Sequence, residues 1–281
     1  AYLESIQCES PGPKRGYHRA LAPPPAEKIS ALACLRPGAW WYFALLPLGG
    51  LDAATLSLAT AREAALGVAH AAALLAFAYG LNGVTDASLD RSAAKNPLAG
   101  RKRAPPSVRA LVAGCAAGTP ALPAALVVLA VSFAYSAPPR LKSVPFVGTA
   151  LNAGIFTPLF WLGPAAAPIA PALPVLFTGL LIQNQLLHER EDLEEDLAAR
   201  VVTTAAVLGD RGTRIAVGAT GAVTALVLTR VADGAVLAAC AAGIVLATST
   251  VLAGAPRRRR HRHLAALAGA IAYVLSAWVV T

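Results

Sequence analysis

Charged residues are scarce in this sequence of 281 residues. Only 14% are Asp, Glu, Lys or Arg, whereas soluble domains carry about 25% charged residues. Hydrophobic residues make up 56% of the chain, and the stretches 64–84, 111–139 and 143–187 contain no charged residue at all. One membrane crossing needs about 20 apolar residues. These stretches therefore exclude an ordinary soluble domain and predict a polytopic membrane protein.

Cysteine is also rare, and its spacing excludes two kinds of site. Cys8, Cys34, Cys115 and Cys240 form neither the close pairs of a structural zinc site nor a disulfide framework. The first residues are polar and rich in proline, and they lack the apolar core of a signal peptide. We expect residues 1–37 to form a flexible polar tail and residues 38–281 to form a single membrane domain.

Apolar runs, separated by Pro, Gly and Asp breakers, predict an all-α fold with nine transmembrane helices. The predicted helices span residues 38–60, 62–84, 107–118, 120–137, 145–163, 166–188, 211–231, 234–254 and 263–280.

The basic residues support this number of crossings. With nine helices, all 24 Lys and Arg residues except Arg62 and Arg230 fall on one side of the membrane. The positive-inside rule places that side, with the N-terminus, in the cytoplasm. The basic run at 256–263 borders an apolar helix, which favours anchoring to anionic lipid over binding to nucleic acid. We therefore expect the lipid bilayer as a partner and no nucleic acid.

Acidic residues number only 15, and eight of them gather just after two apolar helices on the predicted cytoplasmic side. In the first cluster Asn82, Asp86 and Asp90 are four residues apart, and in the second His188, Asp192 and Asp196 are four residues apart. The other acidic residues, all in the second cluster, are Glu189, Glu191, Glu194 and Glu195. Residues at this spacing share one face of a helix. Oxygen ligands of this kind favour Mg²⁺, which is commonly bridged by substrate phosphates. We therefore expect Asn82, Asp86, Asp90, Asp192 and Asp196 to hold Mg²⁺ and a diphosphate between them.

Two alternatives remain open from the residues alone. The run 189–196 could be a solvated helix end, which is the reading we favour for Glu191, Glu194 and Glu195. The first group could be a purely structural polar cluster, although polar residues inside an apolar helix tend to be functional.

Cations suited to a diphosphate occur on the same predicted side. Arg140 and Lys142 lie in the loop that begins Tyr135-Ser-Ala-Pro-Pro, and the prolines predict a stiff, non-helical backbone there. Arg91 and Lys95 follow the first acidic group. Because Arg binds phosphate oxygens in a bidentate way and Lys acts as a point charge, these residues are candidate diphosphate ligands. They could also serve only to set the topology.

Together these motifs resemble the UbiA superfamily of intramembrane prenyltransferases. The resemblance rests on NxxxDxxxD at 82–90, on DxxxD at 192–196 and on the loop from Tyr135 to Lys142. It covers the chain from about residue 38 onward. It implies a helical bundle around a central cavity open to lipid, with Mg²⁺ and a prenyl diphosphate at the two Asp motifs. Tyr135, Arg140 and Lys142 would help to hold the diphosphate while the prenyl group moves to an aromatic or other lipophilic acceptor.

The sequence also departs from the family pattern. Arg200 stands where many members have glycine, and His188-Glu189 stand where many have an aspartate. His188 is a candidate base, and Asn184, in the polar run Gln183-Asn184-Gln185, is a candidate acceptor ligand. Two rival functions stay open: a terpene cyclase that ionises the same diphosphate without an acceptor, and a non-catalytic transporter or scaffold. The sequence fixes neither the donor length nor the acceptor.

Overall fold

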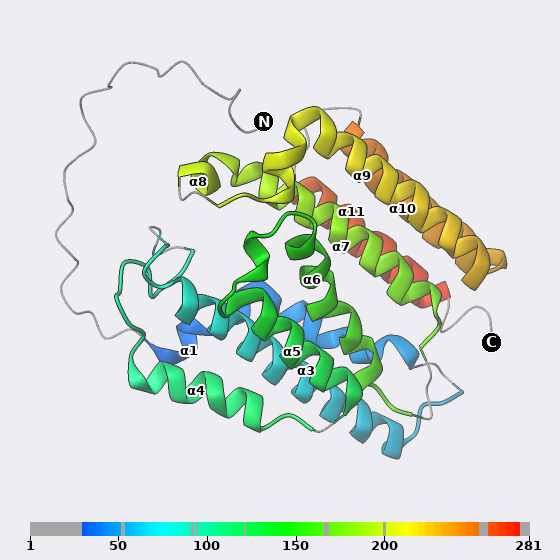
Figure 1. Ribbon diagram of the computed structural model, residues 1–281. Helices are drawn as coiled ribbons and strands as arrows, with labels where there is room; N and C mark the ends of the chain where they lie inside the picture. The colour runs from blue at the N-terminus through cyan, green and yellow to red at the C-terminus, as the bar shows by residue number, and fades with distance from the viewer. Residues whose placement is uncertain are drawn as a thin grey trace.

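The computed structural model describes residues 30–51, 54–90, 93, 95–120, 122–165, 169–198, 201–252 and 258–275. Within those ranges every regular element is a helix, as predicted (Figure 1). The elements are α1 (Ala31–Cys34), α2 (Pro37–Trp40), the 3₁₀ helix η1 (Trp41–Gly50), α3 (Leu58–Asp86), α4 (Pro106–Ala117), α5 (Pro123–Ser136), η2 (Leu141–Ser143), α6 (Val147–Phe156), η3 (Thr157–Leu162), α7 (Ala172–Glu191), α8 (Leu193–Ala198), α9 (Thr204–Val231), α10 (Gly234–Leu252) and α11 (Arg258–Val274).

The prediction of one helix over 38–60 is wrong. The chain forms α2 and η1, leaves the helix at Leu51 with extended backbone, and enters α3 only at Leu58. Pro47 lies inside η1 and has no N–H to donate, which favours the tighter 3₁₀ geometry. Ser57 and Thr60 then form a capping box that fixes the start of α3.

Other helices also differ from the predicted ones. The helix predicted over 145–163 is α-helical only to Phe156 and continues as η3, where Pro158 again removes a donor. Helix α9 begins seven residues before the predicted 211 and bends at Gly209, whose φ of 64° suits glycine. The short α8 was not predicted.

The boundary of the tail at residue 38 is also wrong. Cys34 and Leu35 are buried against the first helices, so the packed part of the chain includes α1. The short apolar run from Ala31 to Leu35 supplies the buried surface. Residues 1–29, which make up most of the predicted tail, lie outside the described residues.

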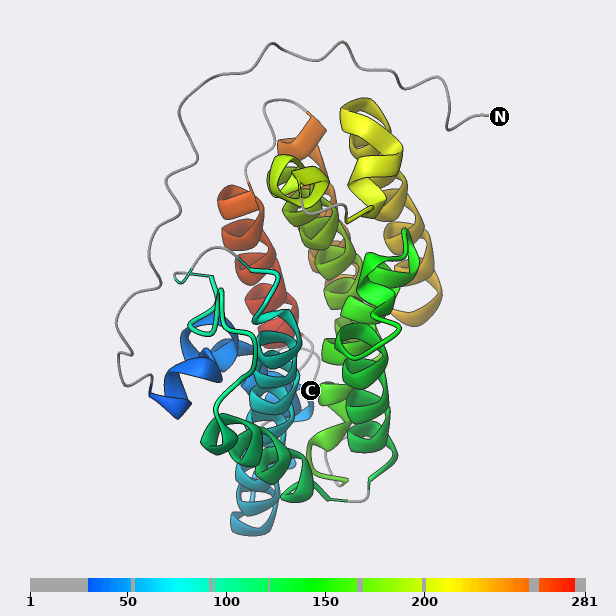
Figure 2. The same cartoon turned by 60° about the vertical axis from the view of Figure 1, so that its left-hand side comes forward.

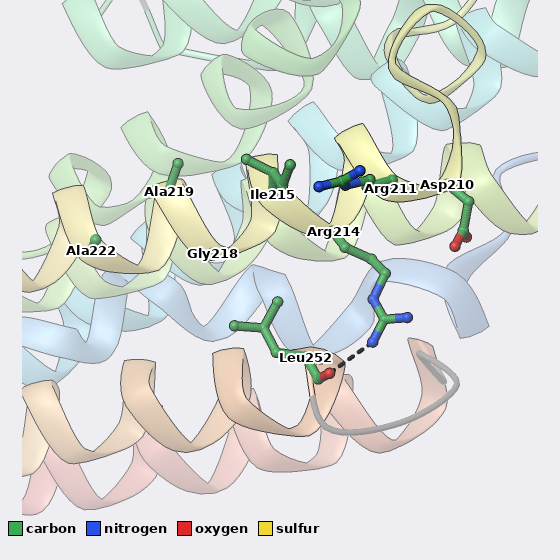
Figure 3. Close-up of a pocket in the computed structure, with 8 residues that line it drawn as sticks. All are labelled: Asp210, Arg211, Arg214, Ile215, Gly218, Ala219, Ala222 and Leu252. Carbon is green, nitrogen blue, oxygen red and sulfur yellow. Dashed lines mark hydrogen bonds between the residues drawn. The ribbon is translucent and has the colours of Figure 1, made fainter.

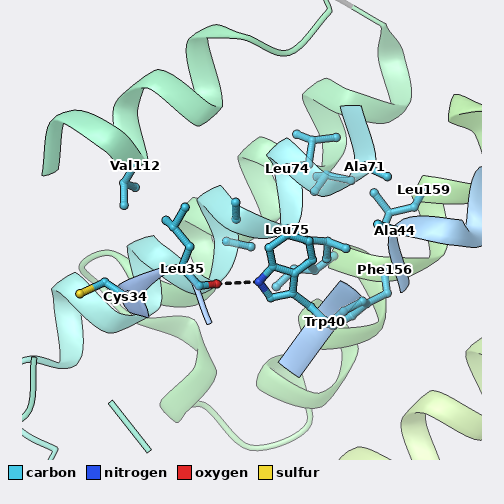
Figure 4. Packing of buried hydrophobic residues seen from close by; sticks show 14 of the residues in the cluster. Cys34, Leu35, Trp40, Ala44, Ala71, Leu74, Leu75, Val112, Phe156 and Leu159 are labelled. Atoms are coloured by element: carbon cyan, nitrogen blue, oxygen red, sulfur yellow. Dashed lines mark hydrogen bonds between the residues drawn. The ribbon is translucent and has the colours of Figure 1, made fainter. Parts of the chain in front are cut away.

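The bundle has two parts, whose main hydrophobic clusters meet at Leu46 and Phe177, and Figure 2 shows the bundle from a second side. In the first part α3 packs against η1, α4 and α5, and α5 packs against α6. Figure 4 shows its centre, where Leu74 and Leu75 lie near Trp40 and the Trp40 indole donates a 2.6 Å hydrogen bond to the Leu35 carbonyl. In the second part α7 packs against α9, α10 and α11.

Small residues let the helices of the second part approach closely. A Cβ added at Gly179 on α7 would lie 2.2 Å from Thr224 Oγ1 on α9, and one at Gly221 would lie 2.3 Å from Thr248 Oγ1 on α10. Close backbone approach through small residues is typical of helix packing in membranes.

The outer surface is apolar, as a membrane bundle requires. By length and composition α3 and α9 could each cross a membrane, and the other apolar helices are shorter. Ile215, Val223 and Leu226 on α9 are each about 60% exposed (63%, 59% and 62%). A row of large exposed aliphatic side chains is unfavourable in water and favourable against lipid. The all-α, polytopic membrane architecture predicted from composition is therefore confirmed.

Candidate active site

The C-terminal ends of α3 and α7, with the segments that follow them, lie on the same side of the bundle, at the left of Figure 1. These ends carry the two acidic motifs. The loop between α5 and α6, which holds the predicted cations, reaches the end of α3. Tertiary structure thus brings three separate sequence motifs together at one end of the molecule.

The first motif and the loop cations form a buried ionic cluster. Asp86 is only 6% exposed. Its carboxylate accepts a hydrogen bond from Arg140 Nη2 at 2.6 Å and a second one from Lys142 Nζ. Lys142 Nζ also donates to Asn82 Oδ1 at 2.7 Å. Asn82, Asp86, Arg140 and Lys142 therefore form one connected cluster, which joins the first motif to the loop.

The loop backbone is shaped to present these cations. It contains a cis Pro138-Pro139 peptide, and Arg140 (φ 59°) and Phe146 (φ 64°) have left-handed backbone, which non-glycine residues rarely adopt. Such strained positions persist only where the surroundings hold them. Arg140 and Phe146 lie at the two ends of the segment that contains Lys142, so we define residues 140–146 as the cation loop.

Lys142 is the more buried of the two cations. Its side chain is 15% exposed, and its Nζ lies 6.0 Å from the centre of the Tyr135 ring. Burial lowers the pKa of Lys142, and the neighbouring Asp86 carboxylate opposes that shift. Tyr135, predicted as a diphosphate ligand, thus contacts the cation with its ring face, an arrangement that stabilises an ammonium group.

Asp90 does not continue the stripe of Asn82 and Asp86. Helix α3 ends at Asp86, and the backbone N–H of Asp90 bonds to the Asp86 carbonyl in a turn. Asp90 Oδ2 accepts a 2.8 Å hydrogen bond from Asn96, a buried residue that also bonds to the Gly83 carbonyl. The spacing therefore brought Asn82 and Asp86 together on one helix, whereas Asp90 lies in the turn beyond the end of α3 and is bonded to Asn96.

Lys95, in the segment that follows the first motif, contacts the second motif. Lys95 Nζ lies 3.0 Å from Asp192 Oδ1, and His188 Nδ1 lies 3.0 Å from Asp192 Oδ2. His188 foremost, and Lys95 after it, hold the pKa of Asp192 at about 2. Asp192 is therefore ionised at neutral pH and able to bind a cation.

The rest of the second motif is also not one continuous stripe. Helix α7 ends at Glu191, Asp192 caps it, and Asp196 lies in the separate helix α8. One turn before His188, Asn184 has its side-chain oxygen buried without a hydrogen-bond partner. That free acceptor leaves Asn184 available as a candidate ligand for a substrate group. Arg91, predicted as a diphosphate ligand, lies outside the described residues, as does Arg200.

The donor set fits Mg²⁺ shared with a substrate. Among the described residues, no three His, Cys, Asp or Glu side chains lie close enough to enclose a metal ion by themselves. Mg²⁺ commonly binds through one or two carboxylates plus substrate phosphates and water. Asn82 and Asp86 on α3, and Asp192 at the end of α7, offer oxygen ligands of that kind.

Glu189, which the sequence placed in the second acidic cluster without a predicted role, is a further polar residue of this region. It is 7% exposed, although it lies in the charged run His188-Glu-Arg-Glu-Asp192. Its carboxylate accepts hydrogen bonds from Thr149 on α6, Gln185 on α7 and the backbone N–H of Ala205 on α9. One sequence signal was available: Thr203-Thr204 before an apolar run is typical of a helix start. The first N–H groups of a helix need hydrogen-bond acceptors, and Glu189 is one.

A shallow groove of about 590 Å³ lies elsewhere, on the outer face of α9 (Figure 3). Arg214 crosses it and donates a 2.7 Å hydrogen bond to the carbonyl of Leu252 at the end of α10. The groove contains none of the motif residues. Its lining consists of Asp210, Arg211, Arg214, Ile215, Gly218, Ala219, Ala222 and Leu252.

Comparisons with known proteins identify the fold. No family model matches the sequence, and no curated protein matches it. Among solved structures, the chain is similar to a UbiA homologue from Archaeoglobus fulgidus bound to DMAPP and Mg²⁺, with a TM-score of 0.67, 21% identity and coverage of 88% of this chain and 99% of that one.

Two further solved structures agree. One is an apo UbiA homologue from Aeropyrum pernix K1, with a TM-score of 0.60, 19% identity and coverage of 90% and 98%. The other is a digeranylgeranylglyceryl phosphate synthase, with a TM-score of 0.62, 15% identity and coverage of 89% and 96%. The chain therefore has the UbiA fold, in agreement with the resemblance carried by its two Asp motifs and its cation loop.

Proposed function

We propose that the protein is an intramembrane prenyltransferase that uses Mg²⁺ and a prenyl diphosphate. The observation that carries the proposal is the convergence of Asn82 and Asp86 with Arg140 and Lys142, beside the second motif at Asp192. A carboxylate suited to bind Mg²⁺, beside two cations suited to bind phosphate oxygens, would stabilise the negative charge that develops on a departing diphosphate. Solved proteins of the same fold are bound to DMAPP or GPP together with Mg²⁺.

The chain's own residues would divide the work of the first step. Asn82, Asp86 and Asp192 would hold Mg²⁺, with Asp90 and Asp196 nearby, while Arg140, Lys142 and Lys95 hold diphosphate oxygens. Bound Mg²⁺ would supply neutralisation of the charge that develops on the leaving diphosphate. The allylic C–O bond breaks, its electron pair leaves with the diphosphate, and a prenyl carbocation remains.

The second step would join the carbocation to a lipophilic acceptor. An electron pair of the acceptor forms the new bond, and the acceptor then releases a proton. His188 is the candidate base for that proton, and Asn184 is the candidate ligand for a polar group of the acceptor. The apolar interior between the two parts of the bundle would shield the cation from water.

We further propose an integral location in the cell membrane with the site and the N-terminus on the cytoplasmic side. Arg101, Lys102 and Arg103 lie in the segment that joins the end of α3 to α4, and they add to the basic residues Lys95, Arg140 and Lys142 of the proposed site. The positive-inside rule supports this orientation. A fusion of a reporter to either end of the chain, with accessibility measured on each side, would test it.

The activity is tested with purified protein, a series of labelled prenyl diphosphates and membrane lipid extracts as acceptors. We expect Mg²⁺-dependent diphosphate release and a prenylated product identified by mass spectrometry. Asp86→Ala and Asp192→Ala should lose this turnover, while Glu63→Gln, an exposed change at the far end of α3, should keep it.

Three results would contradict the proposal at different levels. A cyclic hydrocarbon formed without an acceptor would identify a terpene cyclase instead of a transferase. Background diphosphate release in the wild type would favour a transporter or scaffold. Turnover at the wild-type rate in both Asp variants, with folding intact, would refute the assignment of the site.

A further inference from the structure

We propose that Glu189 is a positioning residue that fixes the cation loop relative to the second Asp motif. The inference rests on the proposed function, because it concerns the geometry of the same diphosphate site. Glu189 lies on α7 three residues before Asp192, and its side chain is directed into the bundle. Within the part of the chain that the structure describes, its buried carboxylate is bonded to no Lys, Arg or His side chain and accepts hydrogen bonds from neutral donors.

The hydrogen bonds form a directed chain from the cation loop to Glu189. Phe146 N–H donates to Thr204 Oγ1 at 2.8 Å. Thr149 Oγ1 donates its only hydrogen to Glu189 Oε1 at 2.9 Å, so Thr204 must be the donor in the 2.8 Å bond between the two threonines. Because Glu189 Oε1 accepts from Thr149, both threonine hydroxyls donate along the chain toward Glu189.

The far end of this chain is a strained point of the cation loop. Phe146 has left-handed backbone and is the N-cap of α6. Lys142 is also held directly against α6, since a Cβ added at Gly148 would lie 2.5 Å from the Lys142 carbonyl oxygen. Fixing Phe146 and the first turn of α6 therefore fixes the position from which Lys142 and Arg140 extend toward Asp86.

The other oxygen of Glu189 holds the start of α9. Glu189 Oε2 accepts from the backbone N–H of Ala205 at 3.2 Å. The N-cap residue of this helix, Thr203, makes no capping bond with its own side chain. A buried carboxylate at a helix N-terminus is favoured by the unpaired N–H groups and the helix dipole. Glu189 thus joins α6, α7 and α9 at the turn that leads into Asp192.

The two ends of the proposed diphosphate site are connected through this residue. Asp192 follows Glu189 on α7, and Lys142 precedes the end of the hydrogen-bond chain at Phe146. Losing the chain should let the cation loop and the second motif move apart. The binding of Mg²⁺ and diphosphate should weaken, in addition to any loss of stability.

Two pairs of variants separate positioning from simple support of the fold. Glu189→Gln keeps the shape but places an amide donor against one of the donors that Glu189 accepts from. Thr204→Val removes the middle hydroxyl and leaves Glu189 intact, whereas Thr204→Ser restores a hydroxyl. Glu191→Gln, an exposed change two residues along the same helix, is the matched control.

Titration calorimetry measures the binding of inorganic pyrophosphate in the presence of Mg²⁺, which requires no prenyl transfer. The KM for the prenyl donor is measured in parallel, with rates expressed per folded enzyme. We expect pyrophosphate affinity to fall, and donor KM to rise, about tenfold in both Glu189→Gln and Thr204→Val. Glu189→Gln sets an amide donor against one of the groups that donate to Glu189, and Thr204→Val removes the hydroxyl that connects Phe146 with Thr149. Thr204→Ser and Glu191→Gln should stay within about twofold of the wild type.

The inference would be overturned if the folded fractions of Glu189→Gln and Thr204→Val both kept the wild-type affinity for pyrophosphate and the wild-type donor KM. This holds even if their melting temperatures fall. A wild-type protein that binds pyrophosphate but transfers no prenyl group would refute the proposed function and leave this inference standing. Absence of pyrophosphate binding in the wild type would refute both.

Discussion

Lys142 and Asn82 are 60 residues apart in sequence, yet Lys142 Nζ donates a hydrogen bond to Asn82 Oδ1 at 2.7 Å. The same ammonium group reaches Asp86. One cation thus joins Asn82 and Asp86 in the last turns of α3 and connects the cation loop with the first motif. The following predictions start from this cluster and extend to the rest of the bundle.

Lys142→Gln should lower kcat/KM for the prenyl diphosphate by about 10- to 100-fold, because a hydrogen bond to a charged group contributes about 1.5–3 kcal/mol. Steady-state kinetics over a range of donor and Mg²⁺ concentrations would measure the change. Lys102→Gln removes an exposed charge on the same side of the protein and should leave kcat/KM unchanged. Equal effects of the two substitutions would show that only the general positive charge matters.

Asp86→Asn should destabilise the fold as well as abolish turnover. The amide cannot neutralise Arg140 and Lys142, whose side chains are 25% and 15% exposed. Removing one partner of a buried ion pair costs about 3–5 kcal/mol of unfolding free energy. Because both cations are partly exposed, we expect a loss of about 3 kcal/mol. Thermal unfolding in detergent would detect it.

For the Asp86 prediction, Asp210→Asn is the control, because Asp210 is paired with Arg190 at a more exposed position. An equal fall in Tm for Asp86→Asn and Asp210→Asn would contradict the buried cluster.

The contact between Lys95 and Asp192 should matter for binding but little for stability. The two side chains are 48% and 27% exposed, so we expect the pair to contribute less than about 1 kcal/mol to unfolding. A double-mutant cycle with Lys95→Ala and Asp192→Asn would measure it. Asp192→Asn should lose Mg²⁺-dependent turnover, whereas Lys95→Ala should only raise donor KM. A coupling free energy of unfolding above about 2 kcal/mol would be inconsistent with such an exposed pair.

His261→Phe should destabilise the second part of the bundle without changing donor KM. The two hydrogens of Gln183 Nε2 are used by the Val217 carbonyl and Thr248 Oγ1, so Gln183 Oε1 accepts from His261 Nε2, 3.0 Å away. Loss of the imidazole leaves that oxygen buried and unpaired, at a cost of about 1–3 kcal/mol.

Thermal unfolding together with donor KM would test the His261 prediction. His263→Phe, an exposed change on the same helix, serves as its control. A raised KM in His261→Phe would mean that this buried cluster also shapes the proposed site.

Sequence patterns predicted the residues of the proposed site better than the path of the backbone through them. The four-residue spacing correctly grouped Asn82 with Asp86, because both lie within α3. It did not predict that α3 and α7 end before Asp90 and Asp196, where other groups, such as Asn96, orient the chain. The single helix predicted over 38–60 failed because Pro47 and the Ser57 cap outweigh a long apolar run.

Glu189 shows why part of the site could not be predicted. In the sequence it is one acidic residue in a charged run that reads as a solvated helix end. Its burial depends on Thr149 and Thr204, which are 40 residues before it and 15 residues after it and reach it only when α6 and α9 pack beside α7.

The sequence by itself determined that this chain is an apolar helical bundle and which motifs carry its acidic and basic groups, because composition and local spacing depend on near neighbours alone. Only the tertiary structure decided how the charges are paired. Asp86 is paired with Arg140 and Lys142, Asp192 contacts Lys95 and His188, and Glu189 accepts hydrogen bonds from neutral donors. The physical reason is that a buried charge is stable only beside its partners, and partners distant in sequence are brought together by packing.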